Sequence, residues 1–449
     1  MSLIQTKSSK EDFGSIISDF ISNIESLHRT LYIVMSFIKH VRKNTNDEFE
    51  EFLSKNAKST KKSETETEYS IEFTSYYEFK QKLRDVEWVN RSGTIIPKSF
   101  VVSLISEYDA YLGMIIRRMY RIKPEVLNSK DNQISFSDIV TYDSLDQIKE
   151  IIIDKEVENL LRNSHPEQFK IIEATFSVIL TKEVEGWNDF VELTERRNLF
   201  VHCNGIVSKQ YLDTCKKHKI EINDLKKGDP LQVSPDYFDN AFNTVLTIGF
   251  MIGHVLWRKF QPEESQDADK HLISVVYSLL TSKHYSATIT LCKFAIKCIG
   301  KKFSSEETRR IIVINYAIAL KFSSKKEEME KLLNENDWSA SSEKFKLAVL
   351  VLNDNNTEAA TTMRKIGCNG EVTKADYNNW PLFENFRETE IFKTTYLEVF
   401  NEESMSISED IKNEQENSKT NCREAHSAPT TTNKPKRHHK RSAKKHKKR

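Results

Sequence analysis

The sequence predicts an all-α protein that contains a helical bundle, an array of helical pairs and a disordered basic tail. Glycine and proline are scarce, at 11 and 9 of the 449 residues, and this scarcity disfavours β architectures, which need many turns. Apolar residues recur at steps of three and four along most of the chain, which is the spacing of a buried helix face. Because 449 residues exceed one compact core, we expect two or three domains.

The charge of the chain is divided between an acidic body and a basic tail. Residues 434–449 contain ten Lys and Arg residues and no Asp or Glu. Since the whole chain carries a net charge of +1, the other 433 residues carry −9. Apolar residues make up 38% and charged residues 30% of the chain, and this balance favours extended helical surfaces and some disorder over one dense core.

Cysteine use and hydropathy predict a cytoplasmic protein that does not enter a membrane. The six cysteines have no paired short spacings, so we expect reduced thiols and neither a disulfide framework nor a zinc site. The most apolar window, residues 242–257, contains Asn243 and His254 and is shorter than the roughly twenty apolar residues that span a bilayer. The N-terminus has no signal-peptide pattern. We expect no cofactor, because no phosphate-cradling glycine loop is present.

Residues 1–97 form the first predicted region. A long helix is expected over residues 12–45, because their apolar side chains form one stripe. Residues 54–70 are rich in Lys, Ser, Thr and Glu, which predicts a mobile loop. Weak alternation over residues 69–74 predicts a short strand. We expect Pro97 to end the region.

Residues 98–259 form a predicted helical bundle. Its first helix begins at about residue 98 and is expected to stop at Pro124. Ser144 and Gln147 have the spacing of a capping box, so a helix is expected from there to about Asn163. The remaining bundle helices are predicted over residues 167–182, 186–202 and 236–259, with a polar connection over residues 213–233.

The last bundle helix contains Gly249 and Gly253, four residues apart. This spacing permits two helices to approach closely. A buried core helix, which the surrounding apolar run favours, and a contact between copies of the chain both fit the pattern.

An array of helical pairs is predicted over residues 269–400, after a linker at residues 260–268. The repeat spacing of roughly 30–40 residues is typical of a tetratricopeptide-like array. A last amphipathic helix is expected between Trp380 and Phe400, and the composition of residues 401–449 predicts disorder. The predicted pairs are 269–282 with 284–299, 305–321 with 325–334, and 341–352 with 356–366.

The candidate site lies at the end of an apolar helix, just before an Asn-Gly corner. Arg197 can neutralise a phosphate, His202 can move a proton near neutral pH, and Asn198 can orient either group. Five residues of ideal helix place Arg197 and His202 about 140° apart. We therefore expect local unwinding at the Asn204-Gly205 corner to bring the imidazole toward the arginine.

The residues beside the motif have structural roles in this interpretation. Glu195 and Arg196 are expected to form an ion pair at the surface. His202 lies at the C-terminal end of the helix, where the helix dipole favours its cationic form and keeps a proton available for a leaving group.

The residues Arg197, Asn198 and His202 resemble the signature of the HEPN superfamily, which is an arginine, a polar residue and a histidine four to six positions after the arginine. The string Arg-Arg-Asn-Leu-Phe-Val-His-Cys-Asn-Gly-Ile-Val-Ser at residues 196–208 is similar to the branch found in bacterial toxin and phage-defence loci, as is the segment at residues 103–112.

The resemblance covers about residues 98–258 and implies a helical bundle that forms a homodimer, so that two Arg–His pairs face one cleft. In active members the pair cleaves RNA without a metal ion. Carried over to this chain, His202 would be the general acid/base and Arg197 would stabilise the charge that develops on phosphorus. The segment at residues 380–383 resembles the helical repeats often appended to such domains.

Three functions remain open from the sequence. The first is a metal-independent endoribonuclease with a toxin or phage-defence role. The second is a non-catalytic helical adaptor that dimerises through the HEPN-like domain and binds a protein partner or an antitoxin through the helical repeats. The third is an RNA-binding protein that relies on its tail, which lacks interleaved aromatic residues and should bind phosphates without sequence preference. The predicted tail contacts to RNA are Lys436, Arg437, Lys440, Arg441, Lys444, Lys445, Lys447, Lys448 and Arg449.

Overall fold

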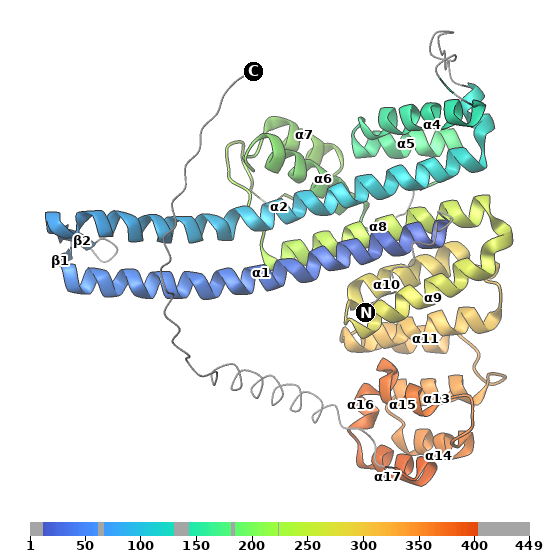
Figure 1. The fold of residues 1–449 in the computed structure, drawn as a ribbon. Helices are drawn as coiled ribbons and strands as arrows, with labels where there is room; N and C mark the ends of the chain where they lie inside the picture. The colour runs from blue at the N-terminus through green and yellow to red at the C-terminus, as the bar shows by residue number, and fades with distance from the viewer. Residues whose placement is uncertain are drawn as a thin grey trace, which may run out of the picture. The chain divides into compact units, whose positions relative to one another are not determined.

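The computed structural model confirms the all-α fold class (Figure 1). The structure describes residues 12–61, 67–129, 142, 144–180, 185–222 and 224–402. The chain divides into two compact units, one that ends at Trp338 and one that begins at Ser339. This division differs from the predicted domain boundaries at residues 97, 259 and 268, because helices on both sides of each of those positions pack together within the first unit.

The first unit begins with a helix, α1 (Phe13–Asn56), which is longer than predicted. The Asp12 side chain caps it by accepting a hydrogen bond from the backbone N–H of Ser15 at 2.7 Å. A two-stranded antiparallel hairpin follows, with Ala57 opposite Ile71 and Lys61 opposite Thr67. The described part of the predicted loop at 54–70 is therefore helix and strand. The hairpin strands are β1 (Ala57–Lys61) and β2 (Thr67–Ile71).

The second long helix, α2 (Tyr76–Ile122), continues through Pro97, so the prediction that Pro97 ends the region is wrong. Proline removes one backbone hydrogen bond from a helix. Here Pro97 is itself buried, and the apolar residues that follow it, such as Val101 and Leu104, are fully buried in the bundle. Helix α2 ends just before Pro124, as predicted. Short 3₁₀ turns flank it, η1 (Phe73–Ser75) and η2 (Pro124–Ser129).

Among the described residues, five further helices belong to the bundle beside α1 and α2 (Figure 1). The capping prediction at Ser144 is confirmed, because its hydroxyl accepts a hydrogen bond from the Gln147 N–H at 3.2 Å. The polar connection predicted at 213–233 overlaps a short helix, whose Tyr211 and Cys215 are buried in a small core with Leu199. The helices are α4 (Leu145–Leu161), α5 (His165–Phe176), α6 (Trp187–His202), α7 (Lys209–Lys217) and α8 (Pro235–Phe260).

The two glycines of α8 are core residues, which confirms the buried-helix interpretation of their spacing. A Cβ atom at Gly249 would lie 2.4 Å from the Phe20 ring, and one at Gly253 would lie 2.3 Å from the Tyr111 hydroxyl. The Tyr111 hydroxyl donates a hydrogen bond to the Gly249 carbonyl oxygen at 2.8 Å. Helices α1, α2 and α8 therefore approach closely where α8 lacks side chains.

We expect Gly253→Ala to lower the free energy of unfolding by about 1–3 kcal/mol, because the new methyl group displaces the Tyr111 hydroxyl and Ile17 from a close-packed core. Urea denaturation followed by circular dichroism measures the change. Gly93→Ala in α2 is the matched control, since only the flexible end of Arg42 lies in its way and alanine favours helix by about 1 kcal/mol. Equal destabilisation by both substitutions would contradict this account of α8.

The predicted linker at 260–268 is helical and belongs to the first unit. Trp257 Nε1 and Gln261 Nε2 each donate to the Glu264 carboxylate at 2.7 Å. Arg258 forms a buried ion pair with Asp269 at 2.7 Å, which fixes the following helix against α8. The elements after α8 are η3 (Pro262–Glu264), α9 (Ser265–Thr281), α10 (Tyr285–Phe294), the π-helical turn η4 (Ala295–Ile299), η5 (Gly300–Lys302), α11 (Glu306–Phe322) and α12 (Lys326–Asn334).

A pair of histidines, the buried His254 and the half-buried His271, joins α8 to α9. His254 Nε2 lies 3.0 Å from His271 Nδ1, and His271 Nε2 lies 3.0 Å from the Ser18 hydroxyl of α1. Burial lowers the pKa of His271 to about 4 and lowers the pKa of the fully buried His254 well below its ordinary value. Both rings are therefore neutral in the folded chain at neutral pH.

We expect the first unit to lose stability as the pH falls from about 6.5 to about 4. In this window the histidines of the unfolded chain bind protons that the folded chain cannot accept, so acid favours unfolding. For His271 the shift corresponds to roughly 3 kcal/mol. Urea denaturation at several pH values measures the slope, which should be shallower in His271→Gln. An identical slope in that variant would show that other groups govern the acid response.

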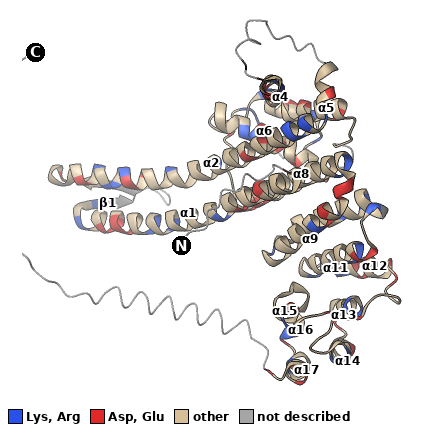
Figure 2. Cartoon of the chain, turned by 45° about the vertical axis from the view of Figure 1, so that its right-hand side comes forward, with Lys and Arg blue, Asp and Glu red and all other residues tan. Residues whose placement is uncertain are grey.

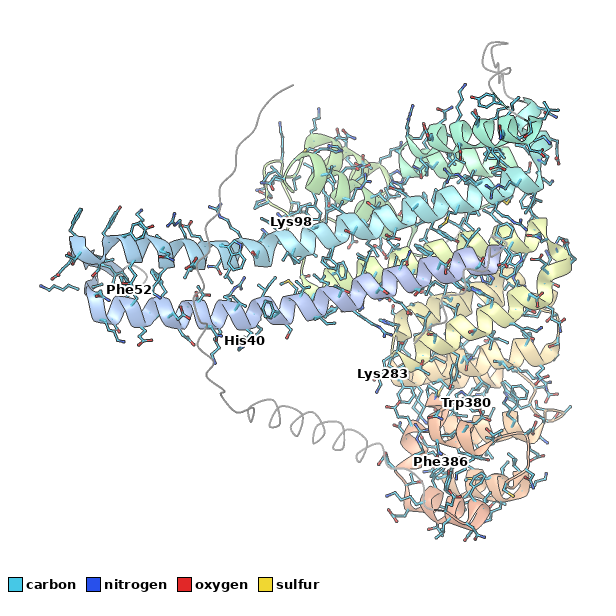
Figure 3. All side chains as sticks on the ribbon, in the orientation of Figure 1. His40, Phe52, Lys98, Lys283, Trp380 and Phe386 are labelled. Atoms are coloured by element: carbon cyan, nitrogen blue, oxygen red, sulfur yellow. The ribbon has the colours of Figure 1, made fainter. Side chains whose placement is uncertain are left out.

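The second unit consists of short helices that pack around a cluster of aromatic rings. The Arg387 guanidinium is buried and donates to the carbonyl oxygens of Tyr377 and Trp380 at 3.0 and 3.1 Å. Figure 3 marks Trp380 and Phe386 in this unit. The helix predicted between Trp380 and Phe400 appears as three shorter elements. The unit consists of α13 (Glu343–Leu352), α14 (Asn356–Ile366), α15 (Lys374–Asn379), η6 (Pro381–Phe383), α16 (Glu384–Arg387) and α17 (Glu390–Phe400).

Among the described residues, one helical stretch, Phe73–Ile122, is long and apolar enough to cross a membrane by length and composition. Half of its most apolar window is buried inside the chain, as in the core helices of bundles, which pass the same test. The most apolar window found in the sequence, residues 242–257, is a different segment. It lies in α8, and most of its residues are buried in the core.

Candidate functional site

Helix α6 carries all three predicted catalytic residues and ends at the predicted corner. Its buried side chains, among them Phe190 and Leu199, fix it in the bundle. The Leu199 carbonyl oxygen accepts hydrogen bonds from the N–H groups of Cys203 and Gly205, each at 2.9 Å. Asn204 and Gly205 both have left-handed backbone, with φ of 53° and 81°, so the chain turns away after His202.

Arg197 is held by side chains on both sides. Its Nη2 lies 3.3 Å from Asp109 Oδ2 on α2, and its Nη1 donates to Asn198 Oδ1 at 3.2 Å. The other Asp109 oxygen lies 2.9 Å from His165 Nε2 at the start of α5. The Arg197 side chain is 25% exposed. Asp109 thus fixes the guanidinium against α2, and Asn198 orients the arginine.

His202 is exposed at the last position of α6. The helix stays regular to His202, and Cys203 is the first residue outside it. The predicted unwinding is therefore absent, because the Leu199 carbonyl closes the helix with normal hydrogen bonds. On a regular helix Arg197 and His202 lie about 140° apart. One chain thus directs Arg197 to α2 and His202 to solvent and does not bring the two together.

The predicted surface ion pair between Glu195 and Arg196 is wrong. Arg196 Nε instead donates to Glu192 Oε1 at 2.7 Å, and both side chains are largely buried. Glu192 also accepts from the Tyr211 hydroxyl at 2.6 Å and from the Tyr237 hydroxyl at 2.8 Å. The Arg196 guanidinium carbon lies 3.9 Å from the centre of the Tyr237 ring. Arg196 is therefore part of a buried network that joins α6 to α7 and α8.

Burial dominates the electrostatics of this network. It raises the pKa of the Tyr211 and Tyr237 hydroxyls, and the neighbouring Glu192 carboxylate raises both further. These hydroxyls therefore stay protonated and donate to Glu192 at any physiological pH. Burial also raises the pKa of Glu195, which lies one turn along the helix from Glu192. The network fixes the start of the motif and takes no part in surface chemistry.

A cavity of about 460 Å³ lies where the end of α6 meets α2. The Lys98 ammonium group lies 5.6 Å from the centre of the Phe200 ring (Figure 3 marks Lys98 on α2). Sequence reasoning missed this cavity. The signal that could have found it is the seven-residue spacing of Arg84, Arg91 and Lys98, which places three cations on one face of a helix. The cavity is lined by Arg91, Thr94, Ile95, Lys98, Ser99, Val102, Phe200 and Asn204.

Two other sequence predictions concern metal and the tail. Within the described parts of the chain, no three His, Cys, Asp or Glu side chains are grouped so as to hold a metal ion. The tail residues predicted to contact RNA, from Lys436 to Arg449, lie outside the described residues.

Comparisons of the chain with models of known protein families, with curated proteins and with solved structures give no match.

Proposed function

We propose that this protein is a HEPN-type endoribonuclease that cuts RNA without a metal ion, with a toxin or defence role. The observation that carries the proposal is the end of α6, where an exposed histidine follows an arginine that the half-buried Asp109 carboxylate holds in place. A fixed guanidinium suits a phosphate better than a free one, since its orientation is set before the substrate binds. The all-α bundle around α6 agrees with the helical bundle that the motif implies.

The site requires two copies of the chain, because one copy separates Arg197 from His202. In a homodimer that joins the ends of two α6 helices, the histidine of one copy can serve the phosphate that the arginine of the other binds. His202 is free to do so, since it is exposed at the last position of its helix. Asp109 and Asn198 occupy two of the arginine's N–H groups, which leaves others for a phosphate oxygen.

The proposed reaction is transesterification followed by product release. His202 removes the proton of a ribose 2′-hydroxyl, whose oxygen attacks the adjacent phosphorus and forms a 2′,3′-cyclic phosphate. The bond from phosphorus to the 5′-oxygen breaks, and that oxygen takes the proton that the His202 imidazole had accepted. Arg197 stabilises the negative charge that gathers on the phosphoryl oxygens.

Incubation of the purified chain with mixed RNA in EDTA tests this proposal. Cleavage products with cyclic phosphate ends, together with a dimer in light scattering, are the expected result. Intact RNA at a protein concentration where the dimer forms would contradict it. In the same proposal the tetratricopeptide-like helical pairs bind a protein partner or antitoxin and the basic tail concentrates RNA.

A second candidate function is a non-catalytic helical adaptor. A cavity of about 580 Å³ favours it, because α5, α8, α10 and α11 surround an apolar floor there. Phe169, Met251 and Phe294 contribute to the floor, and Lys293 and Glu335 to the charged rim. Such a groove suits an amphipathic helix of a partner. A stable dimer that leaves RNA intact both in EDTA and in magnesium would favour this function.

A further inference from the structure

One face of α2 carries a stripe of basic and large apolar side chains that point away from α1. On the opposite side, Phe79 and Lys82 contact Phe49 and Glu48 of α1. Trp88 lies at least about 120° around the helix from both. Residues seven apart share a helix face, with a drift of about 20°. We call this set the α2 stripe, and it consists of Arg84, Trp88, Arg91, Ile95 and Lys98.

The α2 stripe is basic, and its members are exposed except for the half-buried Lys98. Trp88 is 63% exposed and Ile95 is 58% exposed, which is unusual for side chains of this size. Arg84 and Arg91 are exposed too, and the described residues give neither one a carboxylate partner. Both signs of charge occur along α1 and α2 (Figure 2). The acids nearest the stripe in sequence, Asp85 and Glu87, are about 60° and 100° around the helix from Trp88, at its two edges.

The α2 stripe leads to the candidate site. Its last members, Arg91, Ile95 and Lys98, line the cavity of about 460 Å³ together with Phe200 and Asn204 of the α6 end. The Lys98 ammonium group would lie 3.1 Å from a Cβ atom at Gly205. His202 is two residues from Asn204 and exposed. A ligand that follows the stripe therefore arrives beside the residues proposed to cut RNA.

We infer that the α2 stripe is a binding track for single-stranded RNA. Cations at intervals of about 10 Å can follow a phosphate backbone, and an exposed indole and an apolar neighbour can stack an unpaired base. From Arg84 to Lys98 the track is about 21 Å long, enough for several nucleotides. That the stripe delivers RNA to Arg197 and His202 rests on the proposed function, whereas the binding of RNA by the stripe does not.

The test measures binding of a fluorescein-labelled 2′-O-methyl oligouridine of about twenty nucleotides to the full chain, by anisotropy over a salt series. This probe has no 2′-hydroxyl nucleophile, so it stays intact. Arg84→Gln/Arg91→Gln should lower the slope of log affinity against log salt by about 1.4. Trp88→Ala should weaken binding by about five- to 150-fold. The tail is present in every variant and contributes equally.

Lys39→Gln/Lys43→Gln is the matched control, because it removes two exposed cations from α1. It should bind the oligonucleotide almost as the wild type does. Equal salt slopes in the two double variants, or unchanged binding in Trp88→Ala, would overturn the inference. The inference would also be overturned if the stripe variants lost binding to anionic lipid vesicles but kept their RNA affinity, because the stripe would then be a membrane contact.

Failure of the track and failure of the nuclease give different results. If the wild type leaves RNA intact while the stripe variants lose affinity, the track stands and the proposed function falls. If cleavage depends on Arg197 and His202 while the stripe variants bind RNA as the wild type does, the proposed function stands and the track falls. Photo-crosslinking with 5-iodouridine gives an independent readout, and should label the peptide that contains Trp88.

Discussion

Replacement of His202 by alanine is expected to slow RNA cleavage by about 10²–10⁴-fold, which is the contribution of a positioned proton-transfer group. Its free energy of unfolding should change by less than about 0.5 kcal/mol, because His202 is exposed at the end of α6. Initial rates with labelled RNA in EDTA, alongside urea denaturation, measure both quantities. His40→Ala is the matched control, since His40 is an exposed histidine on α1.

Replacement of Arg197 should have an effect of similar size on the rate, with a larger effect on stability. A lost cationic contact to the transition state costs about 10²–10³-fold. Arg197→Ala also deprives Asp109 of a cation, which should lower the free energy of unfolding by about 1–2 kcal/mol, less than for a fully buried pair.

Arg197→Lys keeps the charge and tests the geometry. Because lysine lacks the planar fork that contacts Asp109 and Asn198 together, this variant should recover only part of the rate. Undiminished cleavage in either His202→Ala or Arg197→Ala, with the fold intact, would remove the nuclease proposal. Mixing the two variants adds a test of the shared site, since a mixed dimer keeps one arginine and one histidine.

The largest effect on stability is expected from Glu192→Ala. This carboxylate accepts hydrogen bonds from Arg196, Tyr211 and Tyr237 and is 8% exposed. Its removal leaves a buried guanidinium without a counterion and two hydroxyls without an acceptor, so the free energy of unfolding should fall by about 3–5 kcal/mol. Urea denaturation followed by tryptophan fluorescence measures the loss.

Glu158→Ala is the comparison for Glu192→Ala, because Glu158 also pairs with an arginine four residues away on a helix. That pair is exposed on both sides, and its loss should cost at most about 0.5 kcal/mol. Similar effects of the two substitutions would show that the network around Glu192 does not stabilise the junction of α6, α7 and α8.

Helix positions could be predicted from the sequence because they depend on local spacing. The segment expected at 305–321, for example, is a helix at Glu306–Phe322, with every residue from Ile312 to Leu320 buried. The effect of Pro97 depends instead on tertiary contacts, because burial of the residues on either side of it stabilises the helix by more than the lost hydrogen bond destabilises it. The end of α6 at its Asn-Gly corner was correct, since that signal is also local.

The partners of the site residues were harder to predict. Asp109, which holds Arg197, lies 88 residues earlier in the chain, and no local pattern links the two. The Glu192 partner of Arg196 was accessible in principle, because it lies four residues earlier on the same helix. The adjacent Glu195 cannot take this role, because neighbours in sequence do not face each other on a helix.

The predicted bundle at residues 98–259 is not a domain that can be separated from the residues before it. Phe13 of α1 stacks on Trp257, and Phe20 stacks on Tyr111 with 4.2 Å between the ring centres. Helices α2 and α8, against which α6 packs, are thus covered in turn by α1, which begins some 174 residues before α6 in the chain. A fragment that begins at Pro97 would cut α2 in its middle and remove α1, which would expose the apolar surfaces of α2 and α8 on which these rings pack.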